Sequence, residues 1–420
     1  MEVKPGYKQT EVGVIPEEWD VTTIGEQSQI FGRIGFRGYT VDDIVEEGHG
    51  AIAINPSNIQ DGETVFEKCT YISWHKYEES PEIKIDEGDI ILVKTGSTVG
   101  KTAMVKKLPG KATLNPQVVV FKKLKASPGF FGYTMGFPVV QKQLTEAVVG
   151  GALPTLSQKL VAAFKFPLPT TDEQRAIAEA LSDVDGLLGG LDRLIAKKRD
   201  LKQAAMQQLL TGHTRLHAFH DKWETKRLGE LFEITSSKRV FQSEWRAEGV
   251  PFYRARELAV LGETGRVQNE LFITRELYEK HRRAHGVPSV GDMLVTGVGT
   301  LGKVYVVSDG HEFYFKDGNI IWFKIEGKMS ADFLHQLYLT DTVQRQVAEG
   351  GAGTTVGTYT ISAAKKTTIP FPKLAEQTAI AEVLTDMDAE LAALEQRREK
   401  TRALKQAMMQ ELLTGKTRLV

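Results

Sequence analysis

An internal repeat constrains this chain more than any other feature of its sequence. Residues 167–216 align without gaps on residues 370–419 at an offset of 203, and 28 of the 50 aligned pairs are identical. Self-similarity of this extent does not arise by chance and indicates one structural unit used twice. The 420 residues are also enough for several domains. We therefore expect two copies of a globular part, each followed by one copy of the repeat.

Weaker echoes carry the repeat into the globular parts. They are Trp19 with Ile24-Gly25-Glu26 against Trp223 with Leu228-Gly229-Glu230, Gly88-Asp89-Ile90 against Gly291-Asp292-Met293, and Gly100-Lys101 against Gly302-Lys303. The predicted order is a globular domain at 1–166, a helical spacer at 167–216, a second globular domain at 217–369 and a second spacer at 370–420. The spacers have diverged little and the globular domains almost beyond recognition. This contrast indicates one shared task for the helices and two versions of another task for the domains.

Each spacer has the pattern of a long helix. Thr170 precedes Glu173 with capping-box spacing, and Gly212 and Gly415 stand where a left-handed glycine ends a helix. The apolar seam, with steps of three and four, consists of Ile177, Leu181, Val184, Leu188, Leu191 and Ile195 in the first spacer and Ile380, Leu384, Met387, Leu391 and Leu394 in the second. After a polar stretch it is predicted to resume at Leu201, Ala205 and Leu209 and at Leu404, Met408 and Leu412. We predict that the two helices pack as an antiparallel coiled coil with pseudo-two-fold symmetry.

The globular domains have the pattern of mixed strands and helices. Runs of β-branched and aromatic residues at 90–93, 117–121, 304–307 and 320–323 are bounded by Gly, Asn and Asp, which is typical of strands. The segment 333–347 has the character of a helix. We predict an α/β or α+β fold for each domain, and hence two tandem domains separated by two long helices.

Composition excludes several classes of protein. The single cysteine, Cys69, excludes an internal disulfide and a cysteine-rich zinc site. No run approaches the ~18 consecutive apolar residues of a membrane span, and the first ten residues lack the apolar core of a secretory signal. We therefore expect a cytoplasmic protein.

The formal net charge of −1 hides an uneven distribution. Residues 1–100 hold 8 Lys and Arg against 19 Asp and Glu, whereas residues 101–166 hold 10 lysines against one glutamate. Such segregation could create the basic face that DNA binding requires. Alternatively, the acidic segment could fold over the basic one and neutralise it, and charge alone leaves both readings open.

The glycine–lysine segments are the strongest candidates for phosphate contact. Thr95 to Lys101 follows a predicted strand, but its spacing is one residue short of a nucleotide-binding P-loop; residues 297–303 have the spacing, but Val304 replaces the metal-binding hydroxyl. Nucleotide hydrolysis is therefore disfavoured. The turn amides and lysines could instead hold a DNA phosphate, or the segments could be plain structural turns.

No catalytic or metal-binding set is predicted, since the nine histidines show no metal-ligand spacing. Lysine pairs with phosphates, and arginine and asparagine can also pair with base edges. The candidates for DNA contact are Asn55, Asn58, Lys94, Lys101, Lys106, Lys107, Lys122, Lys123, Arg254, Arg256, Arg266, Arg282, Arg283 and Lys303. The alternative for any one of them is a solvated charge on a loop.

The chain resembles the specificity subunit of type I restriction-modification systems over essentially its whole length. The resemblance rests on the domain–helix–domain–helix order, the openings at Trp19 and Trp223, the glycine–lysine turns, and the helix motif E-Q-x-A-I-A-E-x-L with L-L-T-G-x-T-R-L. It implies a non-catalytic subunit whose two target-recognition domains each read half of a bipartite double-stranded DNA site. The helices would set the spacing and dock two adenine methyltransferase subunits, and restriction subunits could join the complex. S-adenosylmethionine, ATP and Mg²⁺ would then lie on partner chains.

Two other functions remain open at this stage. One is a nucleotide-dependent DNA-processing enzyme that uses the glycine–lysine turns, and the other is a scaffold that bridges partners without reading DNA. If the chain is a specificity subunit, replacing residues 217–369 should change only one half of the recognised site. Inserting about four residues near Leu201 or Leu404 should lengthen the spacer of that site.

Overall fold

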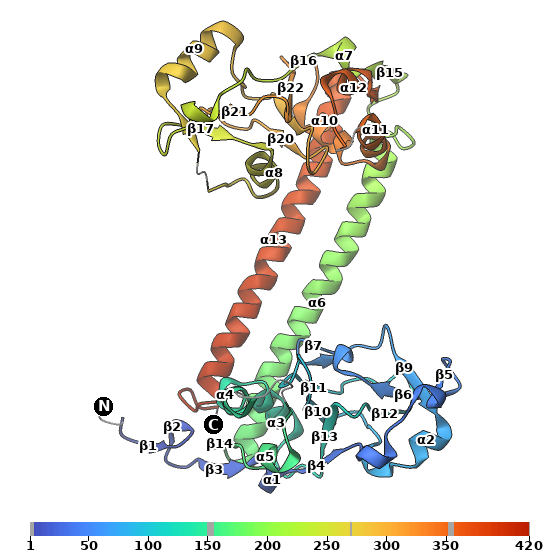
Figure 1. The fold of residues 1–420 in the computed structure, drawn as a ribbon, viewed down its shortest axis with the longest axis vertical. Helices are drawn as coiled ribbons and strands as arrows, with labels where there is room; N and C mark the ends of the chain where they lie inside the picture. Colours follow the sequence, from blue (N-terminus) through green and yellow to red (C-terminus); the bar gives the residue numbers. More distant parts are fainter. Residues whose placement is uncertain (1–3, 149–154, 269–270, 352–356, 420) are drawn as a thin grey trace. The chain divides into compact units, whose positions relative to one another are not determined.

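The computed structural model describes residues 4–148, 155–268, 271–351 and 357–419. Its contacts divide the chain into two compact units: unit 1 comprises residues 1–192 and 397–420, and unit 2 comprises residues 193–396 (Figure 1). Each unit therefore holds one globular domain, the beginning of the helix that follows this domain, and the end of the other helix.

The two spacers form the helices α6 (Thr171–Leu209) and α13 (Leu374–Leu412), each of 39 residues. The Thr170 hydroxyl accepts a 3.4 Å hydrogen bond from the Glu173 amide at the start of α6. Gly212 and Gly415 follow the helix ends with φ of +73° and +70°, in the left-handed region that glycine favours. The start predicted for α6 and the glycine ends predicted for both helices are therefore confirmed.

Unit 1 contains two main sheets. The first has the strand order β4 (Gln29–Gly32), β13 (Val118–Lys122), β10 (Ile90–Val93), β11 (Thr102–Met104), β8 (Glu63–Thr64) and β7 (Ile59–Gln60). The second has the order β12 (Ala112–Leu114), β6 (Gly50–Ile54), β9 (Thr70–Ser73) and β5 (Ile44–Val45). A hairpin of β1 (Tyr7–Thr10) with β2 (Gly13–Pro16), and the pair β3 (Asp20–Thr23) with β14 (Lys165–Leu168), complete the strands. The helices of the domain are α1 (Ile24–Gln27), α2 (Trp74–Glu78), α3 (Pro128–Met135), α4 (Pro138–Val148) and α5 (Gln158–Ala162).

Unit 2 repeats this plan in a reduced form. Its first sheet has the order β16 (Glu233–Thr235), β22 (Ile320–Lys324), β19 (Met293–Thr296) and β20 (Val304–Val306). Its second sheet has the order β18 (Phe272–Ile273), β17 (Val250–Tyr253) and β21 (Tyr314–Phe315), and β15 (Glu224–Arg227) pairs with β23 (Thr368–Phe371). The helices are α7 (Leu228–Leu231), α8 (Ala255–Thr264), α9 (Arg275–His285), α10 (Ala331–Tyr338), α11 (Asp341–Gly351) and α12 (Ile361–Lys366).

The two domains thus share one α+β frame and differ in what is added to it. The run β4-β13-β10-β11 corresponds to β16-β22-β19-β20, and both runs are antiparallel throughout. Unit 1 adds the β7–β8 hairpin beyond β11, whereas unit 2 has helix α8 packed against β20. The strand predictions at 90–93, 117–121, 304–307 and 320–323 are confirmed within about one residue at their ends. The segment 333–347 falls in two helices, α10 and α11, and not in one.

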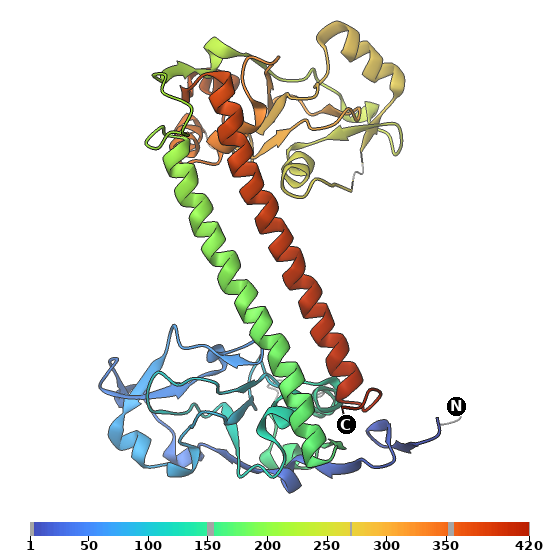
Figure 2. The same ribbon diagram turned by 180° about the vertical axis from the view of Figure 1, so that it is seen from behind.

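A hydrophobic core in each unit includes both long helices. In unit 1, Ile177 and Leu181 of α6 join Leu412 and Leu413 at the end of α13 in one core with strands β10 and β13. In unit 2 the corresponding core contains Ile380, Ala381 and Leu384 of α13 with Leu209 and Leu210 at the end of α6. The beginning of α6 and the end of α13 lie side by side in unit 1 (Figures 1 and 2). Each globular domain is therefore packed on one segment from each helix.

Burial along the helices follows the predicted seam only in part. Six seam residues are buried, namely Ile177, Leu181, Leu191, Ile195, Ile380 and Leu384. The other five, Val184, Leu188, Met387, Leu391 and Leu394, are half-buried. The predicted resumption holds at Ala205, Leu209, Met408 and Leu412, which are buried or half-buried, but it is wrong at Leu201 and Leu404, which are 47% and 55% exposed. Lys202 and Lys405, one residue further along, turn inward and pair with carboxylates of the opposite helix, which explains the shift.

Candidate nucleic-acid interface

The two glycine–lysine segments form loops between antiparallel strands. In unit 1 the loop joins β10 to β11, and Gly96 and Gly100 have φ of +107° and +93°. The unit 2 loop joins β19 to β20, with Gly302 at +72°. A nucleotide-binding P-loop leads from a strand into the N-terminus of a helix, where the backbone amides hold the phosphates. Lys101 and Lys303 each lead into a strand, which argues against the nucleotide-dependent enzyme.

The unit 1 loop leaves several hydrogen-bond donors available. The Leu156 amide donates a 2.8 Å hydrogen bond to the Lys94 carbonyl and thereby holds the loop, and an equivalent bond holds the loop of unit 2. The amides of Ser97 and Thr98 have no hydrogen-bond partner in the part of the chain that the structure describes. Lys101 is exposed and forms no ion pair with a described residue. Free amides next to an exposed lysine are a suitable arrangement for a phosphate.

The other lysines predicted to contact DNA fall into two groups. Lys94, Lys107 and Lys123 form no ion pair with residues that the structure describes. Lys106 pairs with Glu63 at 2.5 Å, Lys303 pairs with Glu263 at 2.6 Å, and Lys122 pairs with both Asp86 and Asp89. Lys122 is a correction to the sequence-based set, because two carboxylates neutralise its ammonium group and its side chain is largely covered.

The two predicted asparagines are structural. Asn58 is 2% exposed, and its amide donates to the carbonyls of Val65 at 2.9 Å and Lys68 at 3.1 Å. It cannot reach a base edge, and its assignment as a DNA contact was wrong. Asn55 is half-buried and donates to the Thr70 hydroxyl at 3.0 Å while it accepts a 2.7 Å bond from Asn115.

The predicted arginines of unit 2 also divide by their partners. Arg254 is bound to Glu257 at the start of α8, and Arg282 is ion-paired with Glu279 at 3.3 Å. Of the predicted arginines, Arg256, Arg266 and Arg283 are exposed and form no ion pair with any described residue. These three remain candidates for DNA contact.

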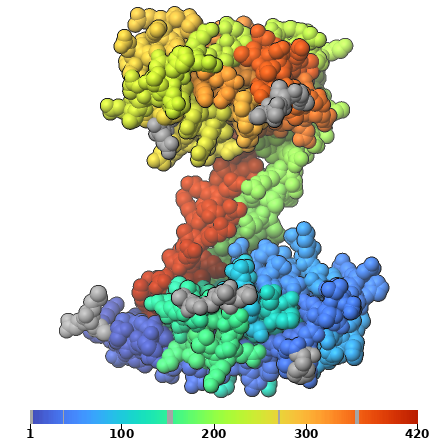
Figure 3. Space-filling view, viewed as in Figure 1, coloured from blue at the N-terminus to red at the C-terminus, as the bar shows by residue number. Residues whose placement is uncertain are grey.

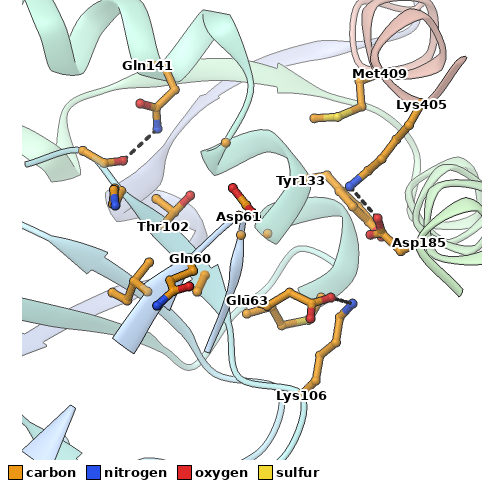
Figure 4. A pocket seen from close by; sticks show the side chains of 18 of the residues that line it. Gln60, Asp61, Glu63, Thr102, Lys106, Tyr133, Gln141, Asp185, Lys405 and Met409 are labelled. Atoms are coloured by element: carbon orange, nitrogen blue, oxygen red, sulfur yellow. Dashed lines mark hydrogen bonds and ion pairs between the residues drawn. The ribbon is translucent and has the colours of Figure 1, made fainter. Parts of the chain in front are cut away.

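A cavity of about 750 Å³ lies in unit 1 beside the glycine–lysine loop (Figure 4). It is lined by residues of β7, β8, β11 and α3 and by side chains from both long helices, among them Lys101, Tyr133, Asp185 and Lys405. The figure shows Lys405 directed at Asp185 on one side of the cavity and Lys106 directed at Glu63 on another. The glycine–lysine loop and both helix segments of unit 1 therefore line the same cavity.

Asp185 joins the two helices and the domain in unit 1. It accepts a 2.7 Å hydrogen bond from the Tyr133 hydroxyl and pairs with Lys405 of α13 at 2.6 Å. Burial, together with the hydrogen bond to this carboxylate, raises the pKa of Tyr133, so the phenol stays protonated and acts as a donor. At the related positions of unit 2, Asp388 accepts from Gln336 at 3.1 Å and pairs with Lys202 at 2.5 Å.

A second network joins each domain to both helices. In unit 1 the fully buried carboxylate of Glu173 accepts from the Trp19 indole at 2.8 Å and from Arg418 at 2.6 and 3.0 Å. In unit 2, Glu376 accepts from Trp223 at 2.9 Å and from Arg215 at 2.5 and 2.7 Å. Sequence reasoning noticed the two tryptophans only as motif positions. Trp19, Glu173 and Arg215 each recur 203 or 204 residues later, as Trp223, Glu376 and Arg418, and this shared offset was the signal that could have connected them.

Further ion pairs show that the two helix segments are antiparallel within each unit. In unit 1, Asp192 pairs with Arg398 at 3.4 Å in addition to the Asp185–Lys405 pair. In unit 2, Arg199 pairs with Glu395, and Lys202 pairs with Asp388 at 2.5 Å. Residue numbers that rise along α6 meet numbers that fall along α13, as an antiparallel arrangement requires.

Comparison with known proteins identifies the family. The type I restriction modification DNA specificity domain matches residues 16–195 and again residues 220–403. The chain belongs to the family of type I restriction-modification specificity subunits. As a specificity subunit, it contains two tandem DNA specificity domains that together account for most of its length.

Two other specificity subunits match along nearly their whole length. The type I restriction enzyme MjaVIII specificity subunit of Methanocaldococcus jannaschii is 25% identical, and the match covers 96% of this chain and 94% of the relative. The putative MjaX specificity subunit of the same organism is 24% identical over 98% of this chain and 97% of the relative.

Solved structures show the same fold at lower sequence identity. The crystal structure of a type I restriction-modification S subunit from M. genitalium matches with a TM-score of 0.59 and 16% identity over 98% of each chain. A chain from a structural study of complex assembly in the type I system matches with a TM-score of 0.55 and 18% identity, covering 96% of this chain and 99% of that one.

No described helix is both long enough and apolar enough to cross a membrane. Among the same residues, no three His, Cys, Asp or Glu side chains are grouped so that they could hold a metal ion.

Proposed function

We propose that this chain is the non-catalytic DNA-reading subunit of a type I complex, in which unit 1 and unit 2 each read one half of a bipartite double-stranded DNA site. The observation that carries the proposal is the contrast between a shared frame and different surfaces. The sheets, the Trp–Glu–Arg networks and the Asp–Lys pairs recur in both units, whereas the β7–β8 hairpin and α8 do not. A subunit whose two domains bind different DNA sequences would keep the same fold in both domains and differ in the elements that contact the DNA.

Phosphate contact is assigned to the glycine–lysine loops and their exposed lysines. In unit 1, Lys101 and the free amides of Ser97 and Thr98 form a donor group on the loop surface. Such contacts fix the position of a protein on the duplex without reading its sequence. Base reading then falls to the elements that differ between the units.

The helices are assigned the spacing and docking tasks. Each unit contains a segment of both α6 and α13, so the length of the helices sets how many residues link the units. Two methyltransferase subunits would dock on this constant part, and restriction subunits could join them. S-adenosylmethionine, ATP and Mg²⁺ would be bound by these partners, and partner subunits would flip and methylate the target adenine.

Mapping of N6-methyladenine in DNA modified by this chain with its methyltransferase partner tests the proposal. We expect a motif with two specific parts separated by a nonspecific spacer. A chimaera in which residues 217–369 come from another specificity subunit should change one part only. A continuous motif, or a change in both parts of the chimaera, would contradict the assignment of one half-site to each unit.

Two binding measurements separate the two alternatives. A bridging scaffold predicts that the assembled complex binds DNA without sequence preference. A nucleotide-dependent enzyme predicts ATP binding by the isolated chain that is lost in Lys101→Ala or Lys303→Ala. The strand that follows each lysine disfavours the enzyme.

A further inference from the structure

The helix that follows a strand of the second sheet differs between the two units at an equivalent place. In unit 1, α2 follows β9, and in unit 2, α9 follows β18; β9 and β18 each pair with the central strand of the second sheet, β6 or β17. Both helices begin with a hydroxyl N-cap, since Ser73 accepts from the Lys76 amide and Thr274 from the Leu277 amide. However, α2 has 5 residues and α9 has 11. The same element has therefore acquired a different length and surface in each unit.

One face of α9 fixes the helix to its domain. Tyr278 is 2% exposed and Leu277 packs against the same core, while the His281 ring stacks on Tyr314 at 4.8 Å between ring centroids and an interplanar angle of 15°. On the flank, Glu312 pairs with Arg275, and Arg282 pairs with Glu279. The guanidinium groups of Arg275 and Arg282 are thus already ion-paired with glutamates of unit 2.

The opposite face of α9 is open and mostly basic. Lys280 and Arg283 are exposed and form no ion pair with any described residue. They are three residues apart and therefore lie on the same side of the helix. With Arg246 and the acidic side chains of Glu244 and Glu276, they line a hollow of about 560 Å³. The α9 segment lies at the surface of unit 2 in the space-filling view (Figure 3).

The dimensions and side chains of α9 suit the major groove of DNA. Eleven helical residues span about 16 Å, and the groove, ~12 Å wide, admits an α-helix. Arginine and lysine pair with the O6 and N7 acceptors of guanine, and glutamate accepts from the cytosine amino group. A rigid helix that exposes Glu276, Lys280 and Arg283 on one side carries the donors and the acceptor for reading a G·C-containing sequence.

We propose that α9 enters the major groove of the half-site bound by unit 2 and that Lys280 and Arg283 read base edges there. This inference rests on the proposed function and names the reading element of one unit. In unit 1 the shorter α2 exposes Trp74 and His75 instead, so the same position presents different chemistry to the DNA.

Arg283→Ala tests the proposal in the full complex, with N6-methyladenine mapping as the readout. We expect the unit 2 half of the motif to relax at one base pair, with a loss of discrimination of about tenfold or more, and the other half to stay unchanged. Arg283→Lys keeps the charge but loses the bidentate geometry, and it should relax the same position. Arg282→Ala, one residue away on the ion-paired flank, is the matched control and should leave the motif intact.

Two results would overturn the inference. In the first, Arg283→Ala and Lys280→Ala weaken binding equally for all sequences and leave the motif unchanged, which would make α9 a phosphate contact. In the second, Arg282→Ala relaxes the motif as much as Arg283→Ala does. The motif of the wild-type complex tests the proposed function, and the motifs of the α9 variants test this inference. A bipartite wild-type motif would support the proposed function even if the α9 variants left the motif unchanged.

Discussion

The indole N–H of Trp19 donates a 2.8 Å hydrogen bond to the carboxylate of Glu173, which is completely buried at the start of α6. The same carboxylate binds Arg418, which follows the end of α13, so one side chain holds together the globular domain and both helices. The repeat places an equivalent carboxylate, Glu376, in unit 2.

Removal of this carboxylate should destabilise unit 1 substantially. We expect Glu173→Ala to lower the free energy of unfolding by about 2–3 kcal/mol, because the Trp19 indole and the Arg418 guanidinium lose their acceptor. For a unit of this size, the thermal transition should fall by roughly 5–10 °C. Differential scanning calorimetry measures the transition. Glu173→Gln, which keeps one oxygen for Trp19, should lose less, and an unchanged melting profile of Glu173→Ala would show that the network contributes little.

The Asp185–Lys405 pair should be energetically coupled, unlike an exposed pair on the same helix. The two side chains are 17% and 21% exposed and lie 2.6 Å apart, whereas Asp172 and Arg175 are 92% and 71% exposed. A double-mutant cycle with Asp185→Asn and Lys405→Met should give a coupling of roughly 1–2 kcal/mol in urea unfolding. The cycle on Asp172 and Arg175 serves as the control and should give less than about 0.5 kcal/mol. Equal couplings for the two pairs would count against a role for Asp185 in joining the helices.

The helices illustrate what the sequence could and could not predict. Their existence, ends and first seam residues follow from local patterns, namely apolar periodicity, a threonine cap and a terminal glycine. Leu201 was assigned to the seam because it is apolar, yet it is exposed, and Lys202 takes the inward position. The acidic partner, Asp388, belongs to the other helix, and no pattern within a single helix reveals it. A usable signal existed, since Asp185, Lys202 and their repeat copies are identical.

The DNA-contact residues were also hard to predict, because the partners that occupy a side chain are distant from it in the sequence. Residue type alone suggested Asn58 and Lys122, but backbone carbonyls surround the Asn58 amide and two aspartates neutralise Lys122. These partners become neighbours only when the sheets form. The exposed cations Lys101 and Arg283 come from the same sequence-based set, so the structure selects among the candidates and adds Lys280.

The exposed lysine of the glycine–lysine loop should contribute to DNA affinity through phosphate contact. We expect Lys101→Ala to reduce the slope of log K against log salt by about 1 and to weaken cognate and altered sites equally. Lys122→Ala is the control, since its ammonium group is already paired with Asp86 and Asp89 and its loss should leave the slope unchanged. Fluorescence anisotropy of the assembled complex on labelled DNA measures both. A change of the methylated motif in Lys101→Ala would instead indicate a base contact.

The length of the two helices should set the spacer of the recognised site. The Asp–Lys contacts are separated by 202 − 185 = 17 residues along α6 and by 405 − 388 = 17 along α13. Inserting four residues after Asp192 and four after Gln396 keeps these separations equal. It should lengthen the spacer by about two base pairs, because four helical residues add ~6 Å and each base pair adds ~3.4 Å.

Both half-sites should remain the same in this variant, as N6-methyladenine mapping would reveal. Insertion into α6 alone makes the two separations unequal, so at least one Asp–Lys contact is lost and the melting temperature should fall. The single insertion is therefore the control for disturbed helix pairing, whereas the matched insertion changes the length of both helices and keeps the two separations equal. If the matched insertion left the spacer unchanged, helix length would not be the quantity that determines the distance between the two half-sites.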